Sequence, residues 1–377
     1  MFAWHVSRKG LVVALMGVVL SAIAGCALLF PSNQVPVVSI VTPVDGATFP
    51  QGQAVTFAGT ADDSEDGALS GASLVWLSSI DGQLGTGQSV IRNDLSVGAH
   101  AITLIATDSQ GATDVESVTI QVLPTVDKMY WTESDGGHIR RANLDASGIE
   151  DLLSGLDRPY GIALDMSAGK MYWAHYGEGK VQRANLDGSG VEELVTGLSG
   201  PVGIGLDTAN NKIYWVSYLD GKIQRSNLNG SGVEDLVTGL SAPYGIAVDS
   251  VNGKVYWTTE GTGKIQRADL DGSNVESVVT GSGLPISIAL DLVNGKMYWA
   301  DRGLLKIRRA ELDGSGIVDV ISGLESPRGI ALDLAGGKLY WTVYFVGKIQ
   351  RANLDGSGVE DLLTGMARPY DIVLGGD

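Results

Sequence analysis

Aromatic, Arg and acidic residues gather in six short segments of the last two thirds of the chain, and each segment directly follows a Tyr-Trp pair. The spacing of the segments is constant while their residues change from one to the next. Aromatic side chains and Arg dominate the energy of protein interfaces, and acids beside them accept hydrogen bonds. The candidate ligand-binding residues of these segments are Glu133, Asp135, His175, Tyr176, Tyr218, Asp220, Glu260, Asp301, Arg302, Tyr344 and Phe345.

A second group of candidate residues lies beside a recurring Pro. Arg158, Arg328 and Arg368 belong to loops that we expect at the same end of the predicted strands as the first group. One face would then gather Tyr, Arg, Phe and acids, which suits a protein or a glycan ligand. The alternative is a set of solvated loops whose sequence varies because nothing constrains it.

Catalytic chemistry has weak support in the sequence. The four His residues are scattered, so they predict neither a metal site nor a Ser-His-Asp set. A regular series of acids instead indicates a hydrogen bond repeated at strand ends, because an active site breaks such symmetry; it comprises Asp165, Asp207, Asp249, Asp291 and Asp333. We therefore predict a non-enzymatic protein without a cofactor.

The Tyr-Trp pairs that position these segments recur every 42 residues without an insertion or deletion. Their Trp residues are Trp131, Trp173, Trp215, Trp257, Trp299 and Trp341. A fixed period of this length, with four short strand signals in each unit, is typical of β-propeller blades. No segment has the helical spacing of apolar residues that helical repeats of similar length require.

The unit around Trp173 predicts strands over 159–165, 170–173, 179–186 and 191–195, with a hairpin turn at Asp187-Gly188-Ser189-Gly190 between the last two. The first unit has no strand of the first kind before Lys128, whereas the chain ends with a surplus one after Arg368. The last strand is therefore expected to complete the first blade and close a ring of six.

These units resemble the YWTD, or low-density-lipoprotein-receptor class B, repeat in their Tyr-Trp-Thr, Lys-Ile-Gln-Arg-Ala-Asn-Leu-Asp-Gly-Ser-Gly and Pro-Tyr-Gly-Ile-Ala-Leu-Asp motifs. The resemblance implies a six-bladed extracellular propeller over residues 125–377. The Asp that follows Tyr-Trp-Thr in the family is present only as Asp301. We expect a binding or scaffold module; a lactonase- or lyase-like propeller enzyme and a carbohydrate-binding surface protein are the alternatives.

Residues 35–124 alternate short β-type stretches with turn signals, which predicts a β-sandwich. This segment resembles bacterial immunoglobulin-like and PKD-like surface modules, and we expect it to act as a spacer. Asp62, Ser64 and Asp66 are spaced like the start of a calcium loop, but the position of its bidentate Glu is Ser73. A solvated acidic loop is the favoured interpretation.

Residues 1–25 have a basic start, an apolar stretch and small residues before Cys26, which is typical of an export signal. The segment from Ile23 to Cys26 resembles the lipobox of bacterial lipoproteins, which implies that Cys26 is diacylated and that residues 26–34 are a short tether. An ordinary secretory leader is the alternative. Two acyl chains would hold the protein stably on a bacterial membrane, the outer one in a Gram-negative cell, with its domains outside the cytoplasm.

The formal net charge is −17, which makes nucleic acid and anionic lipid headgroups poor partners. Cys26 is the single Cys of the chain, so both folded segments must be stable without a disulfide. The acidity suits a soluble surface, and we expect a monomer.

Overall fold

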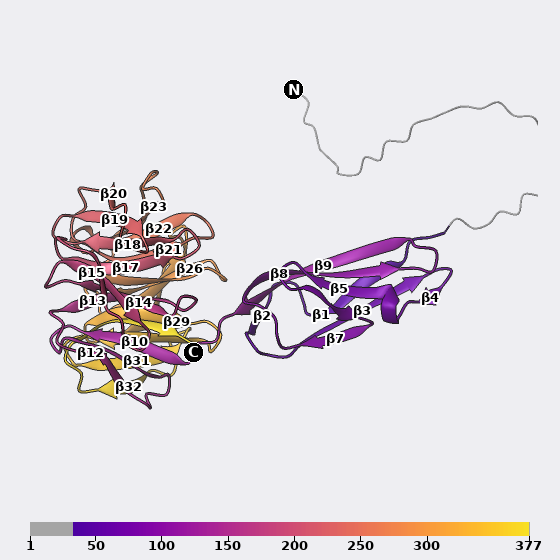
Figure 1. Ribbon diagram of the computed structural model, residues 1–377, viewed down its shortest axis with the longest axis horizontal. Helices are drawn as coiled ribbons and strands as arrows, with labels where there is room; N and C mark the ends of the chain where they lie inside the picture. Colours follow the sequence, from indigo (N-terminus) through magenta and orange to yellow (C-terminus); the bar gives the residue numbers. More distant parts are fainter. Residues whose placement is uncertain (1–32, 377) are drawn as a thin grey trace, which may run out of the picture.

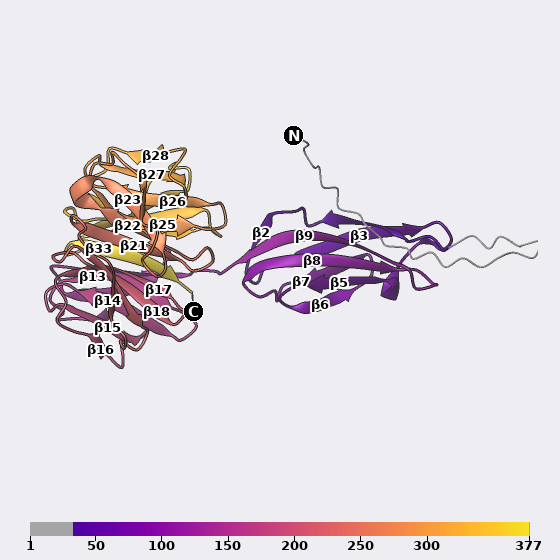
Figure 2. The same cartoon turned by 90° about the horizontal axis from the view of Figure 1, so that it is seen from above.

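The computed structural model describes residues 33–376, and these form strands with two three-residue 3-10 helices. The expected signal peptide, Cys26 and most of the tether lie outside the described residues. Within residues 33–376, no helix is long and apolar enough to cross a membrane. A unit of two sheets lies at one end of the molecule and a ring of sheets at the other (Figures 1 and 2).

The N-terminal unit packs two sheets around one core in which Trp76 contacts Phe57 and neighbours Leu104. One sheet contains β1 (Val37–Thr42), β3 (Val55–Asp63), β4 (Gly67–Ala68) and β7 (Ser89–Arg92). The other contains β2 (Ala47–Pro50), β9 (Thr113–Leu123), β8 (Gly98–Thr107), β5 (Leu74–Ser78) and β6 (Gly82–Thr86), and the 3-10 helix η1 (Gly71–Ser73) precedes β5. The alternation of buried and exposed residues along β3 and β8 explains why the sequence pattern predicted these strands.

The rest of the described chain forms six four-stranded antiparallel sheets. The first sheet contains β12 (Glu150–Leu153), β11 (His138–Asn143), β10 (Lys128–Glu133) and β33 (Pro369–Gly375). The second contains β13 (Pro159–Asp165), β14 (Lys170–His175), β15 (Lys180–Asn185) and β16 (Glu192–Val195). The third contains β17 (Pro201–Asp207), β18 (Lys212–Ser217), β19 (Lys222–Asn227) and β20 (Glu234–Val237).

The other three sheets repeat this order. The fourth contains β21 (Pro243–Asp249), β22 (Lys254–Thr259), β23 (Lys264–Asp269) and β24 (Glu276–Val279), with the 3-10 helix η2 (Glu260–Thr262) after β22. The fifth contains β25 (Pro285–Asp291), β26 (Lys296–Asp301), β27 (Lys306–Glu311) and β28 (Val318–Ser322). The sixth contains β29 (Pro327–Asp333), β30 (Lys338–Val343), β31 (Lys348–Asn353) and β32 (Glu360–Thr364).

The strands of the second sheet match those predicted for the unit around Trp173 to within two residues at each end. The connection between β15 and β16 is longer than the expected hairpin turn. Its glycines Gly188 and Gly190 have φ of 84° and 65°, and the Asp187 carboxylate accepts the Ser189 backbone N–H at 2.9 Å. A six-residue loop stabilised by this Asp therefore takes the place of the predicted four-residue turn.

Neighbouring sheets pack through a Tyr from one unit and a Trp from the next. Tyr172 and Trp215 share one buried cluster, and Tyr214 and Trp257 share another. The same pairing recurs at every boundary, including that of Tyr340 with Trp131, which joins the sixth sheet to the first. Each Tyr-Trp pair thus contributes to two different boundaries, which explains its fixed position in the repeat.

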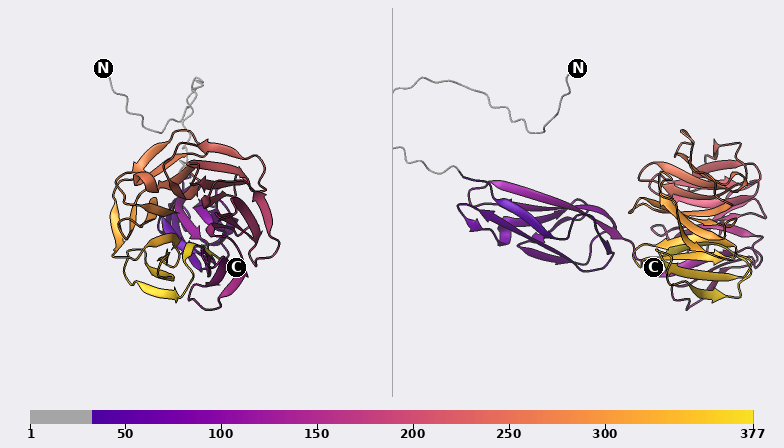
Figure 3. Two further views of the ribbon diagram at one scale, coloured as in Figure 1. Left: turned by 90° about the vertical axis from the view of Figure 1, so that its left-hand side faces the viewer. Right: turned by 180° about the vertical axis from the view of Figure 1, so that it is seen from behind.

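The last strand completes the first sheet, as the sequence predicted. β33 pairs with β10 in an antiparallel register that places Ile372 opposite Trp131 and Gly375 opposite Lys128. The sheets therefore form a closed ring around a central axis, with the two ends of this part of the chain paired side by side (Figure 3).

The two faces of the ring differ in their position relative to the N-terminal unit. The linker from β9 enters on the face where β10 starts, and the Asp127 N–H donates to the Gly375 carbonyl at 3.0 Å there. Each β10-type strand runs from that face to the opposite one, so the segments after the Tyr-Trp pairs lie on the face away from the N-terminal unit (Figure 1). We call this outer face the mouth of the ring.

Candidate functional site

Tyrosine rings and guanidinium groups form a continuous stack across the mouth. Tyr370 stacks on Tyr160 with 3.7 Å between ring centroids, and Tyr160 stacks on Tyr176 at 4.7 Å. On its other side, Tyr370 contacts the guanidinium of Arg328, which lies 4.1 Å from the centroids of both Tyr370 and Tyr344. The stack thus joins the second, first and sixth sheets at the point where the ring closes.

Two further Arg residues lie at the ends of this stack. Arg158 lies 5.0 Å from the Tyr176 centroid, and Arg368 lies 5.6 Å from that of Tyr344. Both have left-handed backbone conformations, with φ of 56° and 57°. The equivalent Gly200, Ala242 and Ser326 have the same left-handed conformation, so it belongs to the repeat and directs the residue at this position into the mouth whatever its type.

Tyr244, Tyr370 and Arg328 close the mouth over the axis of the ring. The two tyrosine hydroxyls are hydrogen-bonded to each other, and Arg328 Nη2 donates to the Tyr244 hydroxyl at 2.7 Å. Tyr160, Tyr244 and Tyr370 share a repeat position and pack against one another. Below them lies a small axial cavity of about 20 Å³.

An open cleft of about 500 Å³ lies beside Tyr244, Tyr370 and Arg328, on the outer face. Its lining includes Tyr176, Tyr218, Glu260, Arg302 and Arg328, all expected at the site, and also Tyr160, Val202 and Tyr244. Arg302 forms an ion pair with Glu260 across the fourth and fifth sheets. The structure therefore brings together residues that are far apart in the sequence.

The rim carries ion pairs between the predicted Arg and acidic residues. Arg368 Nη1 lies 3.0 Å from an Asp135 carboxylate oxygen, and Arg158 Nε lies 3.2 Å from Asp157. Phe345 packs its ring edge-on against Tyr344 at 5.0 Å, and its side chain is 67% exposed. Asp220 is exposed and does not line the cleft.

Three predicted site residues lie inside the fold instead of facing a ligand. Glu133 accepts hydrogen bonds from Trp131, Arg140 and the Ala367 backbone, and Asp301 accepts three from backbone N–H groups. His175 is 2% exposed and contacts Gln182 at 3.0 Å. They occupy one repeat position, which is buried in every sheet, so we do not include these three in the proposed site.

Burial keeps the ionisable groups of the mouth in single protonation states near neutral pH. It raises the pKa of the Tyr160 and Tyr218 hydroxyls, and it raises those of Tyr244 and Tyr370 far above the usual value, so these hydroxyls stay protonated. The Arg328 guanidinium stays charged because Arg does not lose its proton in proteins. The cleft thus offers hydrogen-bond donors and no neutral-pH base apart from the paired Glu260.

Asp371 is a residue of the axial cavity that the sequence interpretation missed. It replaces the Gly that Gly161, Gly203, Gly245 and Gly329 provide in other units, where an added Cβ would lie within 2.8 Å of the next strand. Its carboxylate accepts the Ile162 N–H at 3.1 Å, and burial raises its pKa to about 7. The sequence does contain a signal for this residue, because Asp371 interrupts the series of Gly residues at the equivalent positions.

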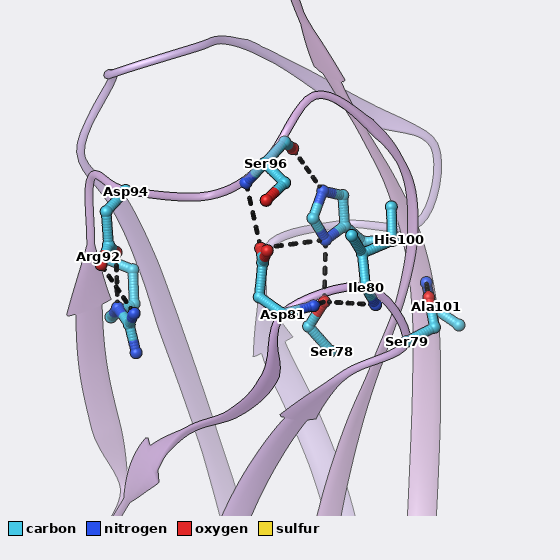
Figure 4. Close-up of polar contacts among 9 residues, drawn as sticks. All are labelled: Ser78, Ser79, Ile80, Asp81, Arg92, Asp94, Ser96, His100 and Ala101. Atoms are coloured by element: carbon cyan, nitrogen blue, oxygen red, sulfur yellow. Dashed lines mark hydrogen bonds and ion pairs between the residues drawn. The ribbon is translucent and has the colours of Figure 1, made fainter.

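A Ser-His-Asp contact does occur, but in the N-terminal unit and in the wrong geometry for catalysis. Figure 4 shows Ser78 and Asp81 both approaching Nδ1 of His100, at 2.8 and 3.6 Å. Nε2 contacts the Ser96 carbonyl at 2.7 Å, whereas a triad has its Ser and Asp on opposite ring nitrogens. His100 is fully buried, so the cluster fastens β5 to β8 at one end of the unit.

The weak calcium candidate does not form a ligand cluster. Both carboxylate oxygens of Asp66 accept hydrogen bonds from Ser109, and neighbouring Asp63 accepts the Glu65 and Asp66 N–H groups. Across residues 33–376, no group of three or more His, Cys, Asp or Glu side chains is arranged to hold a metal ion.

Comparisons with known proteins identify the fold of the ring. No protein-family model matches the chain, and no curated protein matches it. The nidogen chain of a nidogen/laminin complex structure is similar over 66% of this chain and 97% of its own, with 24% identity and a TM-score of 0.61. The ring is a β-propeller.

Two further solved structures are similar at a TM-score of 0.52. A protein of unknown function from Bacteroides thetaiotaomicron is 15% identical and aligns over 91% of this chain and 94% of its own. Virginiamycin B lyase from Staphylococcus aureus is 19% identical and aligns over 72% of this chain and 88% of its own. At these identities the similarity establishes the fold alone, and the neighbours include both a lyase and a protein crystallised with a binding partner.

Proposed function

We propose that this protein is a non-enzymatic binding module whose ligand docks on the mouth of a six-bladed, YWTD-type propeller. The Tyr-Arg stack beside an open cleft carries the proposal. Its partly exposed Tyr160, Tyr176 and Tyr344 are held in place by the buried Tyr370 and Arg328, and Tyr and Arg are the usual anchors of protein interfaces. In this proposal each four-stranded sheet is one blade, and residues 125–377 form the domain.

The orientation of the mouth supports a role at a surface. The N-terminal unit, which we propose is an immunoglobulin-like spacer over residues 35–124, joins the ring on the opposite face. A lipid anchor at Cys26 would therefore leave the mouth directed away from the membrane. The apolar stretch and small residues before Cys26 support this lipoprotein assignment.

A lyase- or lactonase-like activity is the competing function. The cleft contains one carboxylate, Glu260, and it is neutralised by Arg302. The other ionisable groups around it are protonated donors, which suit recognition better than proton abstraction. Loss of turnover in Glu260→Gln, with ligand binding retained, would establish an enzyme instead.

Affinity capture from the native cell surface tests the binding function. We expect a variant with Tyr176→Ala, Tyr218→Ala and Arg302→Ala to lose a partner that the wild-type protein captures. Val251→Ala is the matched control, since Val251 is 84% exposed and lies in a loop of the opposite face. Equal capture by the wild-type and triple-variant proteins, together with loss in the control, would contradict docking at the mouth.

Membrane fractionation and mass spectrometry test the anchor separately. Cys26→Ser is expected to release the protein from membranes and to abolish acylation, because the thiol is the acceptor in a lipobox. A Cys26→Ser protein that still sediments with membranes, alongside a wild-type protein without an acyl chain, would disprove the lipoprotein assignment.

A further inference from the structure

Arg328 is a buried cation whose hydrogen-bonding capacity is only partly used. Its residue is 7% exposed, one nitrogen donates to the Tyr244 hydroxyl, and its Nε is buried without a partner. Among residues 33–376, no carboxylate lies within ion-pair distance of its guanidinium. A buried charge without a counter-charge is destabilising, so its presence requires an explanation.

The fold of the ring does not supply that explanation. The residues at the equivalent position of the other units are Tyr160, Val202, Tyr244, Ile286 and Tyr370. All five are uncharged, and each begins an inner strand with the same pairing as β29. An aromatic or aliphatic residue therefore suffices to build a blade, and the charge at 328 serves something other than packing.

The surroundings of Arg328 favour an anionic ligand. The other Arg residues of the mouth each have an acid beside them: Arg158 has Asp157, Arg302 has Glu260, and Arg368 has Asp135. Glu260 is the one acid that lines the cleft, and its charge is already compensated. The uncompensated charge of the cleft is therefore positive, although the chain as a whole carries −17.

The aromatic rings of the mouth favour a peptide over a sugar. Tyr160 is covered on both sides by Tyr176 and Tyr370, and Tyr344 contacts both Arg328 and Arg368. A sugar ring needs an open aromatic face on which to stack, and the faces of Tyr160 are covered by its neighbours. The guanidinium of Arg328 is covered in the same way, so a partner group must approach its edge, in its own plane.

We propose that Arg328 receives a carboxylate, and that an Asp or Glu side chain of a protein segment inserted into the cleft supplies it. This proposal rests on the proposed binding function and specifies the chemistry of its ligand. A carboxylate matches the planar edge of a guanidinium through two parallel hydrogen bonds, which makes such a pair both strong and directional. It would also supply the counter-charge that the Arg328 guanidinium lacks.

Acetate tests the receptor itself, independently of any protein partner. The Nε resonance of Arg328 is followed by NMR in the full ¹⁵N-labelled chain during titration with sodium acetate or acetamide. We expect a saturable change of the Arg328 Nε chemical shift with acetate, with a Kd of about 0.1 M for a single charged contact. Acetamide should cause no such change. A resonance that does not respond to acetate would overturn the proposal.

Two variants distinguish a specific role of Arg328 in acetate binding from a general effect of positive charge. Arg328→Tyr introduces the residue that three other units carry, so it is expected to fold. Because this variant lacks the Arg328 Nε, acetate binding is compared through the backbone N–H resonance of Tyr344, which contacts the guanidinium in the wild-type protein. Acetate binding should weaken at least about tenfold. Arg158→Met is the matched control, because it removes a Tyr-stacked guanidinium that already has a carboxylate beside it. Equal losses in both variants, or no loss in Arg328→Tyr, would overturn a specific role of Arg328.

A random constrained-heptapeptide library displayed on phage and selected on the full chain tests the source of the carboxylate. We expect enrichment of Asp or Glu at one position and loss of binding with Asp→Asn in the peptide or with Arg328→Tyr in the protein. Peptides that lack an acid and bind Arg328→Tyr equally would overturn the carboxylate but leave docking at the mouth intact. Failure of every peptide, with acetate still bound, would overturn a protein segment as its source.

Discussion

The boundaries between sheets and the mouth of the ring use the same residue types in opposite ways. At every boundary a Tyr and a Trp from adjacent units pack in the same buried arrangement, as Tyr172 does with Trp215. At the mouth, Tyr and Arg stack across three sheets around the closure, and no other part of the ring repeats that arrangement. Symmetry thus accompanies stability, whereas departure from symmetry marks the region where recognition is expected.

Removal of the last strand tests how much the closure of the ring contributes to stability, and it should have the largest effect. Deleting residues 369–377 removes β33, leaves β10 with an open edge and eliminates half of the Tyr160-Tyr370 stack. We expect a loss of about 5 kcal/mol or more, which most single domains do not survive. An unchanged melting temperature of the truncated chain would show that closure by β33 contributes little.

Single buried aromatics provide the next largest effect. Trp257→Ala is expected to destabilise the ring by about 3–5 kcal/mol, the usual cost of truncating a buried Trp, in chemical denaturation followed by circular dichroism. Trp76→Ala is the matched control, because this Trp belongs to the core of the N-terminal unit. Each substitution should lower only the transition of its own unit, and a joint shift of both transitions would contradict their independence.

The pH dependence of the ring tests the break in symmetry at Asp371. Burial raises the pKa of its carboxyl to about 7 from an ordinary 3.8, so the folded state retains a proton that the unfolded state loses. The contribution of the Asp371 carboxyl to the free energy of unfolding is therefore complete below about pH 4 and is lost as the pH rises to 7. Since the side chain borders the axial cavity, we expect about 2 kcal/mol over this range.

Asp371→Asn removes this titration while keeping an oxygen for the Ile162 N–H. We expect the variant to be more stable than the wild-type protein at pH 8 and to lose the decline between pH 4 and 7. Denaturation midpoints measured at several pH values check this. A variant with the same pH dependence as the wild-type protein would mean that Asp371 does not titrate in this range.

The smallest effect on stability is expected at the exposed part of the mouth. Phe345→Ala should change the free energy of unfolding by less than about 0.5 kcal/mol, because the side chain is 67% exposed. Capture of the partner should nevertheless fall, while Val251→Ala on the opposite face leaves it unchanged. A Phe345→Ala protein that captures its partner normally would remove this residue from the binding surface.

The sequence predicted the ring because its information is repeated. The 42-residue period, the Gly positions and the surplus strand after Arg368 together led to the observed strand bounds and to the pairing of β33 with β10. Each blade satisfies the same local rules, so an error in one unit is corrected by the others. The N-terminal unit has no such repeat, so its strands were predicted only from the alternation of β-type stretches with turn signals.

The site was harder to predict because its contacts join different units. Nothing local in the sequence places Arg328 between Tyr344 and Tyr370. The segments after the Tyr-Trp pairs also mix positions with different environments. The first residue beyond each Tyr-Trp-X motif is buried, as in Glu133 and Asp301, and the next one is accessible in every segment except at Ser134. Comparing equivalent positions would have selected Arg328 and Asp371, each of which is the one charged residue of its series.

The pairing of β33 with β10 also determines the order in which the molecule can be assembled. Five sheets consist of four consecutive strands, so each can form as soon as its own segment of chain is available. The first sheet has to wait, because its fourth strand lies more than 200 residues further along the chain. During synthesis the N-terminal unit and five of the ring's sheets can therefore precede the end of the chain, and the arrival of residues 369–375 converts an open arc into a ring.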